Sequence, residues 1–430
     1  MKYLSIILFI FINLSSTSAK ELNFYLESAY KKNPKLNAER KKLKSTEENI
    51  NISRSEFLPS VSISSDIDST NSTNRTNQSG NSLSDISTSK ETKKISVDQK
   101  IFNGFEDFNS LKKSKLEVKK AQMELKLLEQ QVIHDAAFAY YDLIYKIKSQ
   151  KSNLENVDLF ERQVESDSAR MQKGEITLSD LAQSESSLAG ARADFITSKT
   201  ELLTARKNFE RITRQKTPEN INQSKNIKLI LPTSLSEALK IAEDNNPQLL
   251  IAKIDYEISK KNLQIEKAQL SPSASVNYSK SEISDFSSAV DDVEQESVKA
   301  TLTWPILKGG KNYSSIKKSK FKKEQSSLIL EDKVNEVMTD TSNDWSVYQS
   351  TRSVLKATLA QVSAAEIANE GISLEYDAGN KRTTLDVIQS RSFLLNAKIS
   401  NARAERDFII SKFNLLSQLG KLTLTNIKNF

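Results

Sequence analysis

The sequence predicts a mainly α-helical fold with membrane β-strands, in which a helix-strand-strand-helix-helix unit occurs twice. Short motifs recur in the same order in both halves of the 430 residues. Asn33-Pro34 returns as Asn246-Pro247, 246 − 33 = 213 residues later. Lys112-Lys113-Ser114-Lys115 returns as Lys317-Lys318-Ser319-Lys320, 317 − 112 = 205 residues later. The difference of eight residues lies in a polar loop, where changes of length are tolerated. A duplication of this length sets the architecture before any single motif is considered.

The chain begins with a predicted signal peptide, residues 1–19. Lys2 forms the charged region, residues 4–14 the apolar core, and Thr17-Ser18-Ala19 a cleavage site of small residues. The apolar run is too short to cross a bilayer as a helix. We therefore expect an exported protein, and because the chain contains no cysteine, it has no disulfide framework.

Seven-residue repeats predict long helices that share narrow seams. In the first repeat unit, which we expect at 20–215, large residues recur every seven positions and small residues follow three positions later. The large residues are Leu181, Leu188, Phe195, Leu202 and Phe209, and the small ones are Ser184, Ala191, Ser198 and Ala205. This alternation allows close, interlocking helix packing. A helix from about residue 106 to 171 would reach ~100 Å at 1.5 Å per residue. The second unit, expected at 232–420, has the same pattern.

Four segments with alternating apolar and polar residues are predicted as strands, at about 58–68, 94–103, 272–280 and 297–306. Each is about ten residues long, the length that a tilted strand needs to cross a bilayer. The segments between them, 69–93 and 281–296, are polar and are expected to be loops. Four strands leave two open edges, which hydrocarbon does not tolerate. Other subunits must complete the sheet, and three would give 3 × 4 = 12 strands, although the sequence alone does not choose three over two or four.

Composition argues against several other classes of protein. The net charge is +7, but the basic residues are distributed along helices among acids, which indicates solvated faces rather than a nucleic-acid site. His134 is the single histidine, and we expect it to be structural. The sequence contains no nucleophile–base pair, metal-ligand cluster or phosphate loop. We therefore predict no enzyme activity, no cofactor and no metal site.

With these elements in place, the chain strongly resembles the TolC family of outer-membrane export ducts over residues 20–425. The motifs that carry the resemblance are weak one by one, but their order, spacing and duplication are specific. They are the two Asn-Pro helix starts, the strand-to-helix turns at 101–104 and 304–310, Ala139-Tyr140-Tyr141-Asp142-Leu143, and the tip segments 174–181 and 376–387.

The resemblance implies a homotrimer with a 12-stranded β-barrel in the outer membrane and a long α-helical coiled-coil tunnel in the periplasm. An equatorial region would come from the linker 216–231 and the short tail 421–430. Such a duct serves a tripartite efflux pump or a type I secretion system of a Gram-negative cell. It contacts outer-membrane lipid and opens when a periplasmic adaptor and an inner-membrane transporter of the RND or ABC type dock.

The resemblance also assigns residues at the two tips, about 172–180 and 376–386. Ser179 and Asp180 would form a latch with Tyr376 and with a cation. This sequence has one extra residue between Gly379 and Asp386, so both Lys381 and Arg382 remain candidates for that cation. The tip turns, Gly174 and Glu175 in the first and Gly379 and Asn380 in the second, would receive the adaptor.

Two acidic rings narrow the tunnel in the resembled family. Asp386 matches the first ring, whereas Gln389 stands at the position of the second. One ring of carboxylates attracts cations less strongly than two, so we expect weaker cation selectivity. A trimeric surface fibre or adhesin without conduction is the alternative function, and a soluble periplasmic scaffold is a third. The sequence does not identify the cargo.

Overall fold

The computed structural model describes residues 22–218, 221, 229–287, 290–379 and 382–428. The predicted signal peptide therefore lies outside the described residues, as does most of the equatorial linker. The first half of the chain contains α1 (Leu22–Lys32), α2 (Pro34–Ser55), β1 (Ser60–Ser72), β2 (Ile86–Asn103), α3 (Glu106–Gln172) and α4 (Leu178–Thr213). The second half contains α5 (Leu235–Asn245), α6 (Pro247–Ala268), β3 (Ser273–Ser287), β4 (Val290–Thr303), α7 (Lys311–Asp377) and α8 (Thr384–Gln418), and α9 (Leu424–Lys428) follows.

The two halves repeat each other closely. The starts of α5 and α6 lie 213 residues after those of α1 and α2 (235 − 22 and 247 − 34), and α7 begins 311 − 106 = 205 residues after α3. Each unit opens with a short and a longer helix, divided at the Asn-Pro pair that the sequence marks as a helix start. At the first pair, the Asn33 side-chain Oδ1 accepts from the backbone N–H groups of Lys35 and Leu36. Asn33 thus caps α2, and Pro34 at its first position has no N–H to satisfy.

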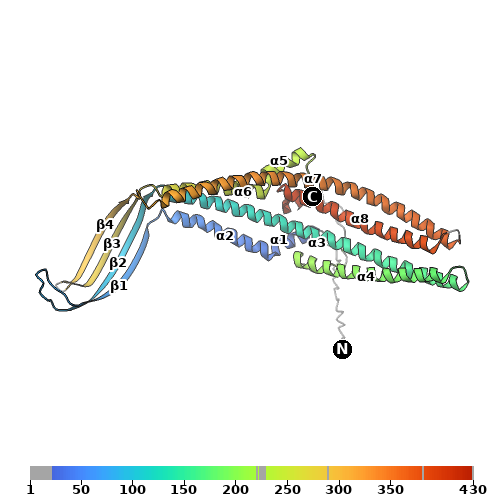
Figure 1. Ribbon diagram of the computed structural model, residues 1–430, viewed down its shortest axis with the longest axis horizontal. Coiled ribbons are helices and arrows are strands. Elements are labelled where there is room, and N and C mark those ends of the chain that lie inside the picture. The colour runs from blue at the N-terminus through green and yellow to red at the C-terminus, as the bar shows by residue number, and fades with distance from the viewer. Residues whose placement is uncertain (1–21, 219–220, 222–228, 288–289, 380–381, 429–430) are drawn as a thin grey trace, which may run out of the picture. The chain divides into compact units, whose positions relative to one another are not determined.

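The chain divides into two compact units that cut across the repeats. One unit comprises residues 39–125 and 247–335 and contains the sheet, and the other comprises residues 1–38, 126–246 and 336–430. In the second of these units, α3 lies beside α4 and α7 beside α8 (Figure 1). Its core includes Tyr25, which packs edge-on against Phe209, with ring centroids 5.0 Å apart.

Most of the expected seam of α4 is buried, and its remaining large residues, Leu188 and Phe195, are partly buried. Leu181, Leu202 and Phe209 of α4 are buried, as are the small residues Ser184, Ala191, Ser198 and Ala205. Small side chains at these positions allow the backbone of α4 to approach its neighbour closely. The alternation of large and small residues in the sequence was therefore a correct guide to the packing of this helix.

The four strands form one antiparallel sheet in the order β1-β2-β3-β4, so β1 and β4 are its edges. Val61, Val97, Tyr278 and Val298 are paired across all four strands as one row. Val298 and Leu302 are 72% and 75% exposed. One face of the sheet therefore carries an apolar band that no part of the described chain covers.

The strands differ from the prediction in length. β3 and β4 reach Ser287 and begin at Val290, so most of the expected loop 281–296 is strand. The sequence alternation fails there because the paired residues are polar: Lys280 lies opposite Glu296, and its Nζ is 3.4 Å from a carboxylate oxygen of Glu294. Likewise β1 extends to Ser72 and β2 starts at Ile86, which shortens the expected loop 69–93.

Gly104 sits where the sheet passes into α3. Its φ is +68°, which favours glycine. A Cβ atom there would lie 2.5 Å from the Cβ of Ser271 and 2.6 Å from the carbonyl oxygen of Ala268. This glycine therefore allows the start of α3 to meet the end of α6.

Candidate functional site

The tips of the two long helix pairs have the same local construction. Thr177 caps α4 and Thr383 caps α8, and each side chain accepts from the backbone N–H three residues on, at Asp180 and Asp386. Each aspartate carboxylate accepts in return from its threonine's N–H, at 2.9 Å for Asp180 and 2.8 Å for Asp386. These are complete capping boxes. Since 386 − 180 = 206 and 383 − 177 = 206, the two boxes occupy equivalent positions of the repeats.

The capping hydrogen bonds keep both carboxylates ionised. The Thr177 side-chain and backbone donors lower the pKa of Asp180, and the Thr383 backbone and side-chain donors lower the pKa of Asp386. Both side chains are partly exposed at the first turn of their helices. The helix N-terminus also favours a negative charge at this position. Each tip thus presents a fixed anion.

Tyr376, near the end of α7, is buried and bonded to a carboxylate of α3. Its hydroxyl donates to Asp167 Oδ1 at 2.6 Å. Because a phenol has a single proton, the 3.0 Å contact with Thr384 places Thr384 as the donor. Burial, followed by the hydrogen bond to Asp167, raises the pKa of Tyr376. The tyrosine therefore joins the second helix pair to the first as a neutral phenol.

Asp167 is fully buried and has donors on both oxygens. Gln163 Nε2 donates to Oδ1 at 2.9 Å, and Ser184 Oγ of α4 donates to Oδ2 at 2.6 Å. The guanidinium of Arg170 lies over the Tyr376 ring, 4.4 Å from its centroid. Buried polar groups are stable only when they are hydrogen-bonded, and this cluster supplies donors to both Asp167 oxygens. Three helices, α3, α4 and α7, therefore converge on one carboxylate.

A second contact between the helix pairs lies beside this cluster. Arg391 Nη1 of α8 donates to the Leu159 carbonyl oxygen of α3 at 2.9 Å, and its guanidinium lies 5.9 Å from the Phe160 ring centroid. Phe160 belongs to a small core with Val157 and Ala191, against which Ile388 of α8 packs. Burial lowers the pKa of Arg391. Apolar and polar contacts thus hold α8 against α3.

The remaining predicted residues lie on the exposed tip surface. Ser179 and Gln389 are exposed. Arg382 Nε donates to Glu375 Oε2 at 2.6 Å, and Arg170 Nε donates to Glu175 Oε2 at 3.2 Å. Gly174 and Gly379 have φ of +76° and +75°, as tight turns after helices require. Lys381 and Asn380 lie outside the described residues.

The structure therefore groups the candidate residues differently from the predicted latch. Tyr376 contacts Asp167 and Thr384, whereas the Asp180 carboxylate accepts from Thr177, the N-cap of its own helix. Sequence reasoning missed Asp167, Thr177, Thr383 and Glu375. A signal for Asp167 was available: it lies seven residues after Phe160 and fourteen after Asn153, both buried, so it occupies a seam position with a charged side chain.

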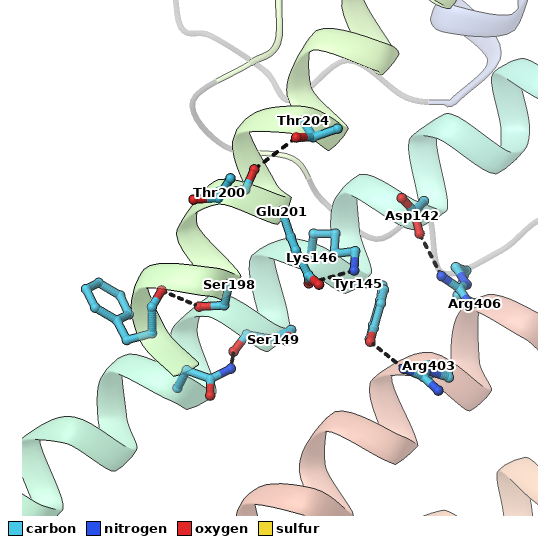
Figure 2. A network of polar contacts seen from close by, with 12 residues as sticks. Asp142, Tyr145, Lys146, Ser149, Ser198, Thr200, Glu201, Thr204, Arg403 and Arg406 are labelled. Carbon is cyan, nitrogen blue, oxygen red and sulfur yellow. Dashed lines mark hydrogen bonds and ion pairs between the residues drawn. The ribbon is translucent and has the colours of Figure 1, made fainter. Parts of the chain in front are cut away.

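A separate polar network joins α3 to α4 and α8 (Figure 2). Arg406 Nη1 of α8 donates to Asp142 Oδ1 at 2.6 Å, and Arg403 Nη2 donates to the Tyr145 hydroxyl at 3.3 Å. On the other side of α3, Lys146 Nζ lies 2.8 Å from Glu201 Oε2 of α4. These contacts fix α3 between its two neighbours.

Other candidate sites have structural explanations. His134 Nε2 lies 2.6 Å from Asn414 Oδ1, so the histidine joins α3 to α8. Within the described ranges, no group of three or more His, Cys, Asp or Glu side chains is placed to hold a metal ion. No helix of the described chain is both long and apolar enough to cross a membrane.

Known proteins resemble this chain over most of its length. The family model for outer membrane efflux protein matches residues 25–213 and 238–421. The chain is 27% identical over 403 residues to the outer membrane efflux protein BepC of Brucella suis, covering 93% of this chain and 85% of that one. It is 24% identical over 426 residues to the outer membrane protein TolC of Escherichia coli, covering 95% and 84%.

Solved structures show the same fold. The outer-membrane channel OprN superimposes with a TM-score of 0.81 at 17% identity, covering 93% of this chain and 90% of that one. The outer membrane protein VceC of Vibrio cholerae has a TM-score of 0.79 at 16% identity, covering 93% and 96%. The chain belongs to the outer membrane efflux protein family, whose members are channels of the Gram-negative outer membrane rather than enzymes.

Proposed function

We propose that the chain forms, as a homotrimer, the exit duct of a tripartite efflux pump or a type I secretion system. Three copies of the four-stranded sheet would close a 12-stranded barrel in the outer membrane, and the helices would continue it as a tunnel in the periplasm. The duct itself is passive. A periplasmic adaptor and an inner-membrane transporter of the RND or ABC type would supply cargo and energy.

The observation that carries this proposal is the sheet with an apolar face and two edges. β1 and β4 each have a single partner in the sheet. Exposed Val61, Ile63, Ile67, Val298 and Leu302 would lose contact with water if lipid covered that face. Backbone groups on an open edge cannot be left unpaired in hydrocarbon, so β4 of one copy must pair with β1 of the next.

The tips would form the closed end of the tunnel. We infer that the contacts of Tyr376 and Arg382, together with Ser179, Asp180 and Lys381, hold the resting tips together. Within one chain, Tyr376 and Arg391 support this proposal because they join the second helix pair to α3. Pairs of charges at an exposed surface contribute only ~0.5–1 kcal/mol each. The buried hydrogen bond between Tyr376 and Asp167 therefore restrains α7 against α3 more strongly than the exposed charge pairs do.

Asp386 would form a ring of three carboxylates at the tunnel entrance, with Gln389 one helical turn beyond it. The lowered pKa of Asp386 supports this role because the carboxylate stays charged at neutral pH. Adaptor docking on the tip turns, at Gly174, Glu175, Gly379 and Asn380, would move the two helix pairs apart. Opening in this way is a shift between two states of the tips.

Extraction and conductance measurements test the proposal together. The full-length chain, expressed in a Gram-negative host, should fractionate with the outer membrane, extract as a trimer and conduct in planar bilayers. A trimer without conductance would support the fibre or adhesin instead, and a monomer in the soluble periplasmic fraction would support the scaffold. In the same bilayers, Gln389→Asp should raise cation selectivity and strengthen block by trivalent cations. An unchanged reversal potential would remove Gln389 from the constriction.

A further inference from the structure

The helices that leave the sheet both begin with an exposed aromatic residue followed by lysines on the same face. In α3 these are Phe108, Lys112 and Lys115. In α7 they are the residues 205 positions later, Tyr313, Lys317 and Lys320. Spacings of four and three residues place them in one stripe of the helix. All six are exposed. Lys112 Nζ lies 4.1 Å from the centroid of the Phe108 ring, so the two side chains lie together on the surface.

Positions beside the stripe on each helix are packed. Ser114 and Val118 of α3 are buried, and the Ser114 hydroxyl lies 2.7 Å from the Ser53 hydroxyl of α2. Ser319, the equivalent of Ser114 in α7, is buried as well. The exposed stripe side chains take no part in these packing contacts. Lys320 has an acidic neighbour on its own helix, with its Nζ 4.0 Å from Glu324 Oε1, and exposed ion pairs of this kind are weak enough to leave the lysine available to a partner.

A polar groove of about 500 Å³ lies between α3, α6 and α7, on a different side of α3 and α7 from the stripes. Its lining includes Lys113, Lys318 and Lys322, together with the hydroxyls of Ser110 and Ser315. Glu117 and Glu266 also line it, and Lys113 Nζ lies 3.7 Å from Glu117. In α7, residues 311–323 contain six lysines, and the first acidic residue is Glu324. The local charge is thus positive on balance.

Between the sheet and the lysines lies a zone of exposed apolar side chains. Trp304, Ile306 and Leu307 follow β4, and Phe105 precedes α3. Ile306 and Leu307 are 84% and 85% exposed. Along the chain the order is apolar strand face, aromatic and aliphatic residues, and then lysines. A membrane has the same order of hydrocarbon, interface and headgroups, and Lys112 and Lys317 lie only six residues into their helices, ~9 Å.

We propose that the six stripe residues form a belt that binds anionic phospholipid headgroups of the periplasm-facing leaflet. This inference rests on the proposed function only in placing the sheet in the membrane with the helices on its periplasmic side. Lysine is a compact, mobile cation that suits a phosphate group. Its long side chain reaches toward the headgroups while the neighbouring aromatic ring occupies the interface. The belt would fix how deeply the barrel sits.

The test compares two variants of the full-length protein that lose the same charge. The belt variant is Lys112→Gln, Lys115→Gln, Lys317→Gln and Lys320→Gln. The control variant changes four exposed lysines on other helix surfaces, Lys41→Gln, Lys199→Gln, Lys240→Gln and Lys356→Gln. Each protein is mixed with nanodiscs of phosphatidylethanolamine alone or with phosphatidylglycerol, and the lipid retained after detergent extraction is counted by mass spectrometry.

The wild type and the control variant should retain phosphatidylglycerol preferentially, and added salt should reduce this preference. In the belt variant, each lost lysine should lower the retention of phosphatidylglycerol about fivefold. Equal phosphatidylglycerol preference in all three proteins would overturn the inference. Unchanged lipid preference with increased cation selectivity in bilayers would also overturn it, because the lysines would then line the lumen. The conductance of the wild type tests the proposed function separately. If the wild type does not conduct but the belt variant loses the preference for phosphatidylglycerol, the proposed function fails and this inference holds.

Discussion

Asp180 and Asp386 have the same chemical environment but different proposed roles, which makes them a matched pair. Each carboxylate closes a capping box, and capping lowers the pKa of both. A lowered folded-state pKa stabilises the fold above the unfolded pKa of ~3.9, and this contribution is lost as pH falls through the folded value. We expect Asp180→Asn and Asp386→Asn to lower the melting temperature at neutral pH by similar amounts and to reduce the further loss below about pH 4.

Ion selectivity separates the two aspartates. If Asp386 lines the tunnel entrance, Asp386→Asn should lower cation preference in planar bilayers, whereas Asp180→Asn should leave cation preference unchanged. Both variants weaken the same kind of capping box, so the loss of stability from capping is common to both and does not affect this comparison. Equal shifts of the reversal potential in both variants would show that the tips respond to fraying of their helices rather than to a ring of charge.

The Tyr376 hydroxyl is expected to restrain the resting tip. Tyr376→Phe removes one donor from the buried Asp167 carboxylate, at a cost of about 1–3 kcal/mol to the free energy of unfolding. The closed-state conductance of the trimer should rise, because α7 loses its bond to α3. Thr197→Val is a suitable control, since Thr197 bonds only to the preceding turn of α4 among its recorded contacts. Resting conductance that stays at the wild-type level in Tyr376→Phe would contradict the restraint.

At the residue scale, the sequence predicted where the tip residues lie better than it predicted their hydrogen-bond partners. It identified both tips and the polar residues in them, since glycine and charged residues between two apolar seams are visible in the printed order. It did not predict that Tyr376 bonds to Asp167. That partner depends on the rotation of α7 against α3, and a change of one residue in helix phase turns a side chain by about 100°.

At the scale of elements, the sequence duplication made it possible to predict where the helices begin and end. Regular apolar seams and the two Asn-Pro pairs marked the helices, and α3 ends at Gln172, one residue from the expected position. Strand ends were harder to predict, because β3 and β4 continue through paired polar residues such as Lys280 and Glu296. Backbone hydrogen bonds between strands do not require apolar side chains, so alternation marks only the part of a strand that has an apolar face.

The glycines provide an element-scale prediction. Gly420, just after α8, has φ of +65°, and a Cβ atom there would overlap the Asn245 carbonyl group at the end of α5. Gly420→Ala should therefore destabilise the protein by more than ~1 kcal/mol, through both the backbone conformation and the clash. Gly190→Ala is the control: it lies within α4 with open space around its Cβ position, and it should stabilise the helix by roughly 0.5–1 kcal/mol. Melting temperatures of the two variants measure the difference, and similar values would refute the close approach at Gly420.

At the scale of the whole molecule, a single chain leaves its sheet incomplete. The helices bury their seams within one chain, as Leu202 and Phe209 do in α4. The sheet instead leaves an apolar face and two edges without partners in the described chain. The sequence predicted this incompleteness from the strand count alone, but subunit number depends on curvature and on contacts between copies, which a single chain does not contain.

The apolar face of β4 offers a direct test of how the molecule is completed. Val298 and Leu302 lie on one face of the strand, and Thr301 lies on the other, since neighbouring side chains alternate. If three copies close a barrel in lipid, Val298→Asp with Leu302→Asp would place two charges on the lipid-facing side, at a cost of up to about 2 kcal/mol for Val298 and less for Leu302, which lies nearer the end of the strand. The single control Thr301→Asp would place its charge in the water-filled lumen, where substitutions alter selectivity more than stability. Trimer yield in outer membranes should therefore fall sharply in the double variant and stay near wild type in the control.

Wild-type yields in both variants would mean that lipid does not cover this face of β4. Reduced yields in both variants would mean that both faces of β4 are packed against protein.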